Sequence, residues 1–367
     1  MKILILTTEL SVRNGWARYS LDMVHALQKQ GMTPVVVVNS QNINETTIET
    51  IKILPHFRNY VLNFLTSFWY AWKLRKLAKD CDRIHAFVES YSGVAYFLQI
   101  LTGKEYVVTT HGTYGVLPFK FSLPVRWFHK KTFLTAKKVV CVSTYTATAL
   151  QSYGIYNTTV INNGITFEKF NKGEVPALEL REDILLSVGA LKYRKGQHIA
   201  LQAFAKIAST SPQLKYYVVG EQSDAEYFQK LKNIATDVHV ENRVHFLSGI
   251  SDSELLKLYK KAKVFVLPTL NKGAHFEGFG LVYLEANACG LPVIGSFESG
   301  AEDAIKNGET GILVTQGDSD AVAEAIISLL SKENIWRNMS TAGLVWAKEH
   351  DWKQIIEHYV TLYKSRI

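Results

Sequence analysis

Short runs of apolar, largely β-branched residues recur along the whole chain. The runs are continuous rather than alternating with polar residues, which is typical of strands covered on both faces. They predict strands at Lys2–Leu6, Pro34–Asn39, Arg83–Val88, Tyr106–Thr110, Lys138–Ser143, Thr159–Ile161, Ile184–Val188, Tyr216–Val219, Val244–Leu247, Val264–Leu267, Pro292–Ile294 and Gly311–Val314.

Helical patterns lie between many of these runs, with apolar residues three and four positions apart. The clearest are Tyr19–Gln30, Gly196–Ser209, Asp224–Thr236 and Asp320–Ser331. A last pattern, Ser340–Lys364, predicts one long helix that packs back across the junction between two domains. Alternation of strands and helices indicates βα units around parallel sheets, so the fold class is α/β.

The length of 367 residues exceeds the size at which a single core stops growing, about 250 to 300 residues. Two domains are therefore predicted. The best linker is Thr166–Asp183, which contains Gly173 and Pro176. We place the first domain at residues 1–165 and the second at residues 166–344, and expect about residues 345–367 to return to the first domain.

The excess positive charge lies in the first half of the chain. Up to Ile165 there are 18 Lys and Arg residues against 8 Asp and Glu, a net +10; the rest carries 23 against 25, a net −2. This asymmetry indicates an anionic partner of the first half. A membrane surface, a phosphorylated acceptor and nucleic acid would all fit, and so would a merely soluble basic surface.

Two segments of that half, His56–Lys79 and Val116–Lys138, interleave aromatic and basic residues. The first has too short an apolar stretch to span a bilayer, but it is long enough to lie in the membrane interface. The alternative is a helix that buries its aromatic residues against a sheet and turns its basic residues outward.

Composition indicates an ordinary globular protein, with 47% hydrophobic and 20% charged residues. The three cysteines, Cys81, Cys141 and Cys289, are far apart, which excludes a disulfide scaffold and fits a reducing compartment. The N-terminal apolar run is too short for a signal peptide, and no run of about 18 apolar residues occurs. The cytoplasm is the expected location.

The most specific motif is Phe276–Ala286. Gly278 and Gly280 mark a strand-to-helix turn whose backbone N–H groups suit a phosphate. Glu285 lies about five residues into the helix, roughly 8 Å behind the turn, and Glu277 stands in front of it. The spacing suits a molecule with a sugar, a diphosphate and a ribose in line. Two solvated glutamates beside an ordinary turn would have the same spacing.

With the following Ala288–Ile294, this motif resembles the donor-domain signature of the retaining glycosyltransferases of family 4, two glutamates separated by seven residues. The resemblance continues at Ile161–Ile165, Val188–Leu191, Lys195–Gly196 and Asn307–Gly311, and so covers nearly the full chain. It implies the GT-B fold: two Rossmann-like parallel-sheet domains facing across a cleft, with a C-terminal helix crossing back. The second domain would bind a nucleotide sugar, and the first would present the acceptor.

The resemblance also assigns roles to residues. It implies that Glu277 contacts the transferred sugar and Glu285 the nucleotide ribose. The whole turn, Gly278, Phe279, Gly280 and Leu281, is assigned to donor binding.

A basic turn follows the strand Ile184–Val188 and would clamp the donor diphosphate. Lys195 matches the lysine of the family, and Gly189 is assigned to the donor site with it. The family usually has an arginine where Ala190 stands, so Arg194 or Lys192 would replace it. Without the other motifs, a solvated basic turn would explain these residues better than a diphosphate clamp.

Two residues of the first half complete the expected site. Gly15, after Asn14, matches a glycine loop of the family that approaches phosphate, although most members have two adjacent glycines. His111 follows the strand Tyr106–Thr110, at the end where open parallel sheets bind ligands. The family has a histidine there, near the transferred sugar; alone, His111 would be a structural histidine.

Two Asp-x-Asp motifs, at Asp80 and Asp82 and at Asp318 and Asp320, match the minimal metal-binding pattern of other sugar transferases. Such short matches are common by chance. Helix capping and turns explain both pairs better, so neither a metal nor a cofactor is expected.

The sequence therefore predicts a retaining, metal-independent glycosyltransferase that uses Glu277, His111 and Lys195 and needs no protein nucleophile. It would move a hexosyl-type sugar from a nucleoside-diphosphate sugar to a glycan or lipid-linked acceptor in cell-envelope polysaccharide or glycolipid synthesis. We expect a peripheral protein at the inner face of the cell membrane, with no nucleic-acid partner. The alternative is a catalytically silent binding subunit of a polysaccharide-assembly complex, which Ala190 leaves open. A nicotinamide dehydrogenase would need Gly-x-Gly-x-x-Gly after the first strand, and that motif is absent.

Overall fold

The computed structural model of the protein describes residues 1–11, 15–40, 47–56 and 60–365, except for the side chains of residues 60–64. The chain forms two compact units. The first contains residues 1–164 and the C-terminal segment from Trp352, and the second contains Ile165–Asp351.

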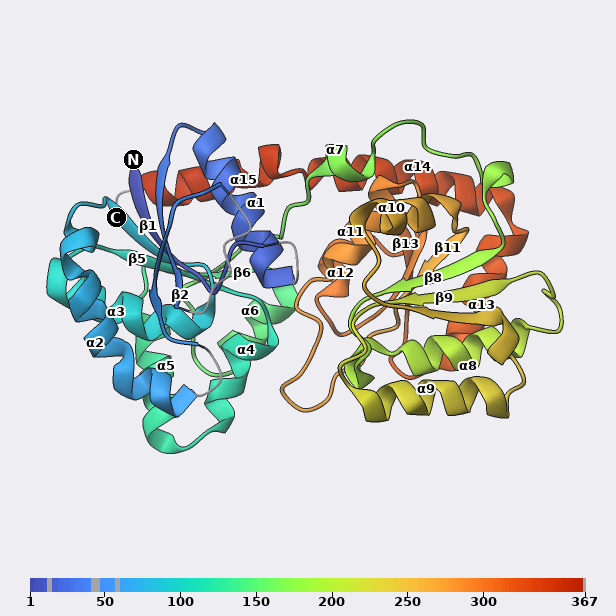
Figure 1. The fold of residues 1–367 in the computed structure, drawn as a ribbon, viewed down its shortest axis with the longest axis horizontal. Helices are drawn as coiled ribbons and strands as arrows, with labels where there is room; N and C mark the ends of the chain where they lie inside the picture. The colour runs from blue at the N-terminus through green and yellow to red at the C-terminus, as the bar shows by residue number, and fades with distance from the viewer. Residues whose placement is uncertain (12–14, 41–46, 57–59, 366–367) are drawn as a thin grey trace. The chain divides into compact units, whose positions relative to one another are not determined.

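The first unit is built on a parallel sheet that has seven strands within the described residues, in the order β3-β2-β1-β4-β5-β6-β7 (Figure 1). Its strands are β1 (Lys2–Leu6), β2 (Thr33–Asn39), β3 (Thr50–Leu54), β4 (Arg83–Ala86), β5 (Tyr106–Thr110), β6 (Lys138–Cys141) and β7 (Thr158–Val160). Its helices are α1 (Gly15–Lys29), α2 (Tyr60–Lys79), α3 (Ser92–Thr102), α4 (Thr113–Val116), α5 (Leu123–Thr135), α6 (Thr144–Gln151) and α15 (Trp352–Lys364). The order reverses at β1 and β4, which makes the sheet a doubly wound one.

The second unit repeats the architecture with a six-stranded parallel sheet in the order β10-β9-β8-β11-β12-β13. Its strands are β8 (Ile184–Val188), β9 (Lys215–Val219), β10 (Val244–Leu247), β11 (Val264–Val266), β12 (Val293–Ser296) and β13 (Gly311–Val314). Its helices are α7 (Phe167–Phe170), α8 (Gln197–Ile207), α9 (Ala225–Asp237), α10 (Asp252–Lys261), α11 (Leu281–Ala288), α12 (Ala301–Ala304), α13 (Ser319–Ser331) and α14 (Glu333–Glu349). The predicted α/β class with two parallel-sheet units is confirmed.

Every strand expected from a continuous apolar run is present, with each end within two residues of its predicted position. Strand β3, which pairs with β2 at the edge of the first sheet, was not predicted. Only Leu54 of this strand is fully buried, and Lys52 at its centre is exposed. An edge strand with one covered face does not show the continuous run that identified the others.

The prediction of one helix over Ser340–Lys364 is wrong, because the helix breaks at His350 and Asp351, between α14 and α15. The carbonyl of His350 accepts the N–H of Ile165 at 2.9 Å, and Asp351 accepts the N–H of Phe167 at 2.9 Å. The helix therefore ends where its polar groups bind a distant part of the chain, which no local pattern reveals.

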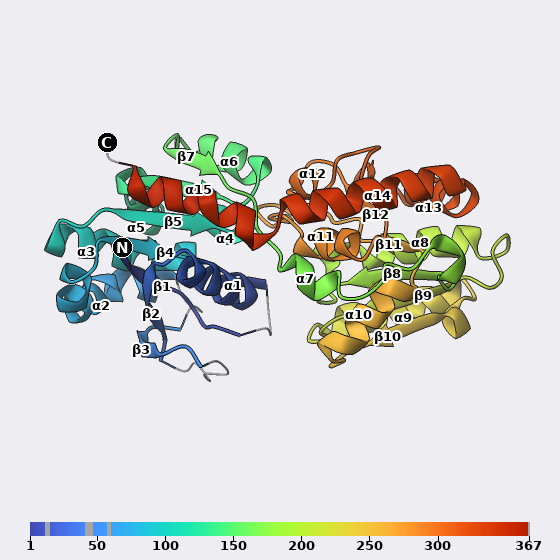
Figure 2. The same ribbon diagram turned by 90° about the horizontal axis from the view of Figure 1, so that it is seen from above.

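Helix α15 is part of the core of the first unit, where it packs beside α1 (Figure 2). His85 contacts the hydroxyl of Tyr363 at 2.5 Å through Nδ1 and the hydroxyl of Thr109 at 2.8 Å through Nε2. The hydroxyls of Tyr19 and Tyr359 are 3.0 Å apart. Burial, with a smaller contribution from His111, lowers the pKa of His85 to about 3. The imidazole of His85 is therefore neutral in this hydrogen-bond network.

Replacing Tyr363 by phenylalanine is expected to destabilise the first unit by about 1 to 3 kcal/mol, because Nδ1 of the buried His85 loses its partner. Urea denaturation followed by tryptophan fluorescence measures the change. Tyr156→Phe is the control, since Tyr156 is 74% exposed. Equal losses in both variants would show that the contact with His85 contributes nothing.

Candidate active site

The basic turn of the second unit lies directly after β8. Residues Tyr193–Lys195 form a 3-10 turn that leads into α8 through Gly196. Gly196 has φ +70°, and a Cβ there would lie 1.8 Å from the carbonyl oxygen of Pro268. Only glycine therefore lets this turn lie against the loop that follows β11. The stem of Lys195 passes over Gly189, whose ideal Cβ position is 3.7 Å from Cε of the lysine.

Glu277 is the centre of a compact ionic cluster formed with this turn. Its Oε2 accepts a hydrogen bond from Nζ of Lys195 at 2.5 Å and one from Nη1 of Arg194 at 3.0 Å. The side chains of Glu277 and Lys195 are only 10% and 13% exposed. The structure thus brings together three residues that the sequence had assigned to the donor site, and Arg194 rather than Lys192 reaches the carboxylate.

The carboxyl group of Glu277 is ionised at neutral pH. Burial alone would raise the pKa of Glu277, but the charges of Lys195 and Arg194 outweigh it and hold the pKa below its ordinary value. Burial lowers the pKa of Lys195, while Glu277 opposes this change. Two cations share one carboxylate, so the cluster has a net positive charge with which to attract an anion.

The turn after Glu277 leads into α11. Gly280 has φ +89° and forms the N-cap of that helix, which begins at Leu281. The carbonyl of Glu277 accepts the N–H of Gly300 at 2.8 Å and ties the turn to the loop after β12. Phe279 is buried, with its ring 6.2 Å from that of His350. Phe279 therefore offers a ligand its backbone rather than its side chain.

Glu285 is the fifth residue of α11 and points to a buried partner. Its Oε2 accepts a hydrogen bond from the hydroxyl of Tyr259 at 3.0 Å, and both residues are buried. Tyr259 lies on α10 and was missed by the sequence analysis, because nothing local marks a tyrosine that meets a glutamate 26 positions later.

In the first unit, His111 follows β5 and is oriented by a backbone contact. Its Nε2 lies 2.9 Å from the carbonyl oxygen of Phe87. A carbonyl only accepts, so Nε2 holds the proton and Nδ1 is left as an acceptor. Burial lowers the pKa of His111 to about 4, which keeps the ring neutral.

The start of α1 lies near this histidine. Gly15 is exposed and is the first residue of the helix, and the ring of Trp16 lies 6.4 Å from that of His111. The residue that follows Gly15 in α1 therefore lies beside His111. Asn14, the other residue of that expected loop, lies outside the described residues.

Glu89 is a buried carboxylate that the sequence analysis missed. It lies just after β4, and neither of its oxygens has a hydrogen-bond partner among the described residues. Burial raises its pKa to about 8. Glu89 is therefore protonated at neutral pH. The only signal in the sequence is an acidic residue directly after a continuous apolar run.

The aspartate pairs have structural partners. Asp318 is the N-cap of α13 and accepts the N–H groups of Asp320 and Ala321, which confirms the interpretation as a helix cap. Asp320 pairs with Lys206 at 2.6 Å, and Asp82 accepts the N–H of Lys2 at 2.7 Å. Across the described part of the chain, no group of three or more His, Cys, Asp or Glu residues is placed to hold a metal ion.

The two Rossmann-like units define the GT-B class of nucleotide-sugar-dependent transferases. Residues 13–169 match the model of "Glycosyltransferase Family 4", and residues 169–346 match that of "Glycosyl transferases group 1". The chain belongs to this family, as its motifs indicated.

The chain is also similar to glycosyltransferases with known names. The chain is 32% identical over 185 residues to a GDP-mannose-dependent alpha-(1-6)-phosphatidylinositol monomannoside mannosyltransferase of Mycolicibacterium smegmatis, covering 50% of this chain and 46% of that protein. It is 32% identical over 223 residues to the capsular polysaccharide biosynthesis glycosyltransferase CapM of Staphylococcus aureus, covering 56% of this chain and 54% of that protein. The chain thus spans about half the length of these curated relatives.

Solved structures agree on the fold over the full chain. Anabaena HepE in complex with UDP has a TM-score of 0.82 at 21% identity and covers 100% of both chains. The lipopolysaccharide glycosyltransferase WaaG has a TM-score of 0.75 at 16% identity, with 99% of this chain and 100% of that chain covered. No helix in the described parts of the protein is long and apolar enough to cross a membrane.

Proposed function

We propose that the protein is a retaining glycosyltransferase that binds a nucleoside-diphosphate sugar in its second unit. The cluster of Glu277, Lys195 and Arg194 beside the start of α11 carries this proposal. A diphosphate needs cations and backbone N–H donors, and a sugar needs a carboxylate. Lys195 and Arg194 lie within hydrogen-bonding distance of the Glu277 carboxylate, and α11 begins four residues after Glu277, at Leu281.

The chemistry follows from the charge that develops on the leaving group. As the bond from the anomeric carbon to the diphosphate breaks, Lys195, Arg194 and the start of α11 stabilise the growing negative charge. Oxygen Oε1 of Glu277 accepts a sugar hydroxyl, since both cations bind Oε2. The acceptor oxygen attacks from the face that the diphosphate leaves, its proton passes to the departing diphosphate, and the anomeric configuration is retained.

Two further residues are assigned to the donor. His111 accepts a sugar hydroxyl through Nδ1, because its Nε2 is engaged with Phe87. Glu285 accepts a ribose hydroxyl while Tyr259 orients its carboxylate.

A thermal-shift and hydrolysis panel of UDP-, GDP- and ADP-sugars tests the proposal. We expect one nucleotide class to raise the melting temperature and to be hydrolysed slowly, with EDTA leaving both effects intact because no metal is required. UDP-glucose is the first probe, since HepE is described in complex with it. Binding without hydrolysis or transfer would favour the silent binding subunit, and no binding of any nucleotide sugar would overturn the proposal.

We infer further that the protein acts at the inner surface of the cell membrane on a lipid-linked or envelope-glycan acceptor. The named relatives act on phosphatidylinositol mannoside and in capsular polysaccharide synthesis. The observation that supports this for the present chain is an apolar and basic face formed by α2, α3 and α5.

This face is open rather than buried against the sheet. Trp69 and Trp72 on α2 are each 49% exposed. Nζ of Lys73 lies 3.3 Å from the centre of the Trp69 ring, and the Arg75 guanidinium lies 3.9 Å from that of Trp72. Aromatic side chains flanked by cations suit the interface between lipid headgroups and acyl chains.

Aromatic contacts join the three helices of this face into one layer. Phe68 of α2 packs edge-on against Phe97 of α3 at 5.4 Å, and Phe97 stacks on Phe128 of α5 at 5.6 Å. The exposed Leu123 and Trp127 on α5 extend the apolar surface. Tyr60 and Phe64, also counted in the sequence pattern, have side chains outside the described part of the structure.

The intact protein is expected to sediment with phosphatidylglycerol vesicles at low salt and to be released at high salt. Each basic residue near an anionic surface contributes about 1 kcal/mol, and the Debye length falls from about 10 Å at 0.1 M salt to about 3 Å at 1 M. A variant with glutamine at Lys73, Arg75, Lys76 and Lys79 should lose most of this binding. The charge-matched control replaces Lys215, Lys232, Lys257 and Lys332, four exposed lysines of the second unit. Equal sedimentation of the two variants would exclude α2 as the anchor.

A further inference from the structure

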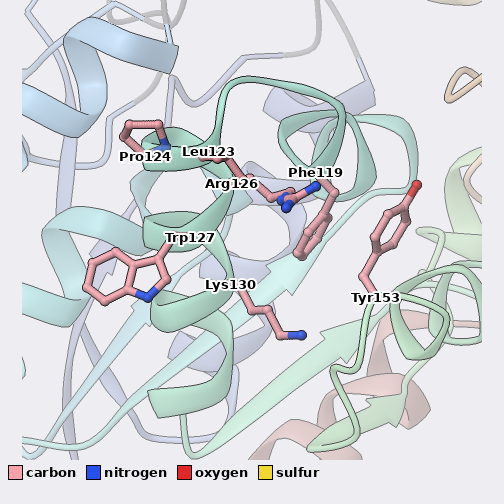
Figure 3. A pocket seen from close by; sticks show the side chains of 7 residues that line it. All are labelled: Phe119, Leu123, Pro124, Arg126, Trp127, Lys130 and Tyr153. Atoms are coloured by element: carbon pink, nitrogen blue, oxygen red, sulfur yellow. The ribbon is translucent and has the colours of Figure 1, made fainter.

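A pocket of about 630 Å³ opens in the first unit, and none of the residues assigned to the donor lines it (Figure 3). Its volume is within the range of small-molecule sites. It lies between α5, the turn Leu117–Lys120 before it and the loop after α6, and it is lined by Phe119, Leu123, Pro124, Arg126, Trp127, Lys130 and Tyr153.

One wall of this pocket is a flat aromatic surface. The rings of Phe119 and Tyr153 stack with centres 4.5 Å apart and planes 13° from parallel. Leu123 and Trp127 are 69% and 67% exposed, so apolar surface continues from the pocket to the outside of α5. The pocket therefore offers an apolar path that reaches the basic face proposed to meet the membrane.

The polar groups of the pocket are cations. Arg126 and Lys130 are one helical turn apart and extend from α5 toward the side on which Phe119 and Tyr153 lie (Figure 3). Neither forms an ion pair with any described residue. No Asp or Glu occurs in the sequence between Glu105 and Glu168. The two charges are thus left for an anion from outside the protein.

We propose that this pocket binds the phosphate group of a lipid phosphate between Arg126 and Lys130, with the hydrocarbon chain against Leu123 and Trp127. This deepens the proposed function, on which it rests, because it identifies the acceptor as a sugar carried on a phosphate-bearing lipid. Two unpaired cations one helical turn apart match the charge of a phosphate, and this complementarity identifies the head group of the ligand. The exposed apolar surface beside them fixes the rest of the ligand as hydrocarbon.

The test uses the intact protein and farnesyl monophosphate below its micellar concentration, measured by isothermal titration calorimetry. Binding is expected to weaken about tenfold or more in the double variant Arg126→Gln and Lys130→Gln. The variant Lys232→Gln and Lys257→Gln, at two exposed positions of the second unit, removes the same charge and should bind like the wild type. Trp127→Ala should weaken binding of farnesyl monophosphate but not of inorganic phosphate. The replaced residues Arg126 and Trp127 are exposed, so folding is not at risk, and thermal unfolding verifies it.

Farnesol has the hydrocarbon chain without the phosphate, and inorganic phosphate lacks the chain. Each should bind at least about tenfold more weakly than farnesyl monophosphate. Equal affinity for inorganic phosphate would overturn the lipid part of the proposal, and equal affinity for farnesol would overturn the phosphate part. Equal loss in the variant of the second unit, or no binding to the wild type, would overturn the site itself. The nucleotide-sugar panel tests the donor site, which shares no residue with the lining of this pocket, so its failure leaves these results unchanged and can be told apart from them.

Discussion

Replacing Glu277 by alanine or glutamine is expected to slow sugar transfer by about 10²- to 10³-fold, while the nucleoside diphosphate still binds. The carboxylate is the proposed contact of the transferred sugar, and losing one such group from a dry site costs about this much. It also neutralises part of the charge of Lys195 and Arg194. Without it both cations are free to hold the diphosphate, so affinity for the nucleotide should stay equal or increase. Single-turnover kinetics and calorimetry with the diphosphate measure the two effects.

The controls separate a ligand contact from a structural one. Glu226→Gln on the exposed first turn of α9 should change neither quantity. Glu285→Gln should weaken nucleotide binding as well as turnover, because Glu285 is assigned to the ribose. Tyr259→Phe removes only the hydrogen-bond partner of Glu285. It therefore shows how much of the loss in nucleotide binding comes from the buried contact between Tyr259 and the Glu285 carboxylate. Intact turnover and nucleotide affinity in both glutamate variants would overturn the assignment.

Most of the fold could be predicted because most of its elements have a local sequence pattern. Strands covered on both faces, such as β5 and β8, are continuous apolar runs, and every residue of each is buried. The exposed edge strand β3 lacks such a run and was missed. The break before α15 depends on contacts between Asp351 and Phe167, which are 184 positions apart, and no window of sequence contains both.

The residues of the candidate site also fall into those that a local motif reveals and those that depend on distant contacts. Glu277, Gly278 and Gly280 could be found because they are neighbours in one motif. The choice between Lys192 and Arg194 could not be made from sequence, since it depends on which side chain of the 3-10 turn reaches a carboxylate 83 positions later. Glu89 could not be assigned at all, because its pKa results from burial by other parts of the unit.

Replacing Glu89 by glutamine is expected to stabilise the first unit at pH 8 by about 3 kcal/mol more than at pH 5. Burial raises the pKa of Glu89 to about 8 from an ordinary value of 4.5. Between these two values the folded protein keeps a proton that the unfolded chain has released. The free energy of unfolding therefore falls as pH rises through this window, by about 1.4 kcal/mol per unit of pH.

Glutamine has the same shape and does not titrate, so the variant removes this term. Urea denaturation of both proteins at pH 5, 6.5 and 8 measures the difference in unfolding free energy, which should grow with pH. The buried histidines His85, His111 and His129 have lowered pKa values, so they destabilise the fold only as pH falls below about 6.5. Their contribution is common to both proteins and cancels. A difference that is constant between pH 5 and pH 8 would show that Glu89 meets water or a cation, and that the carboxylate is ionised in the folded protein.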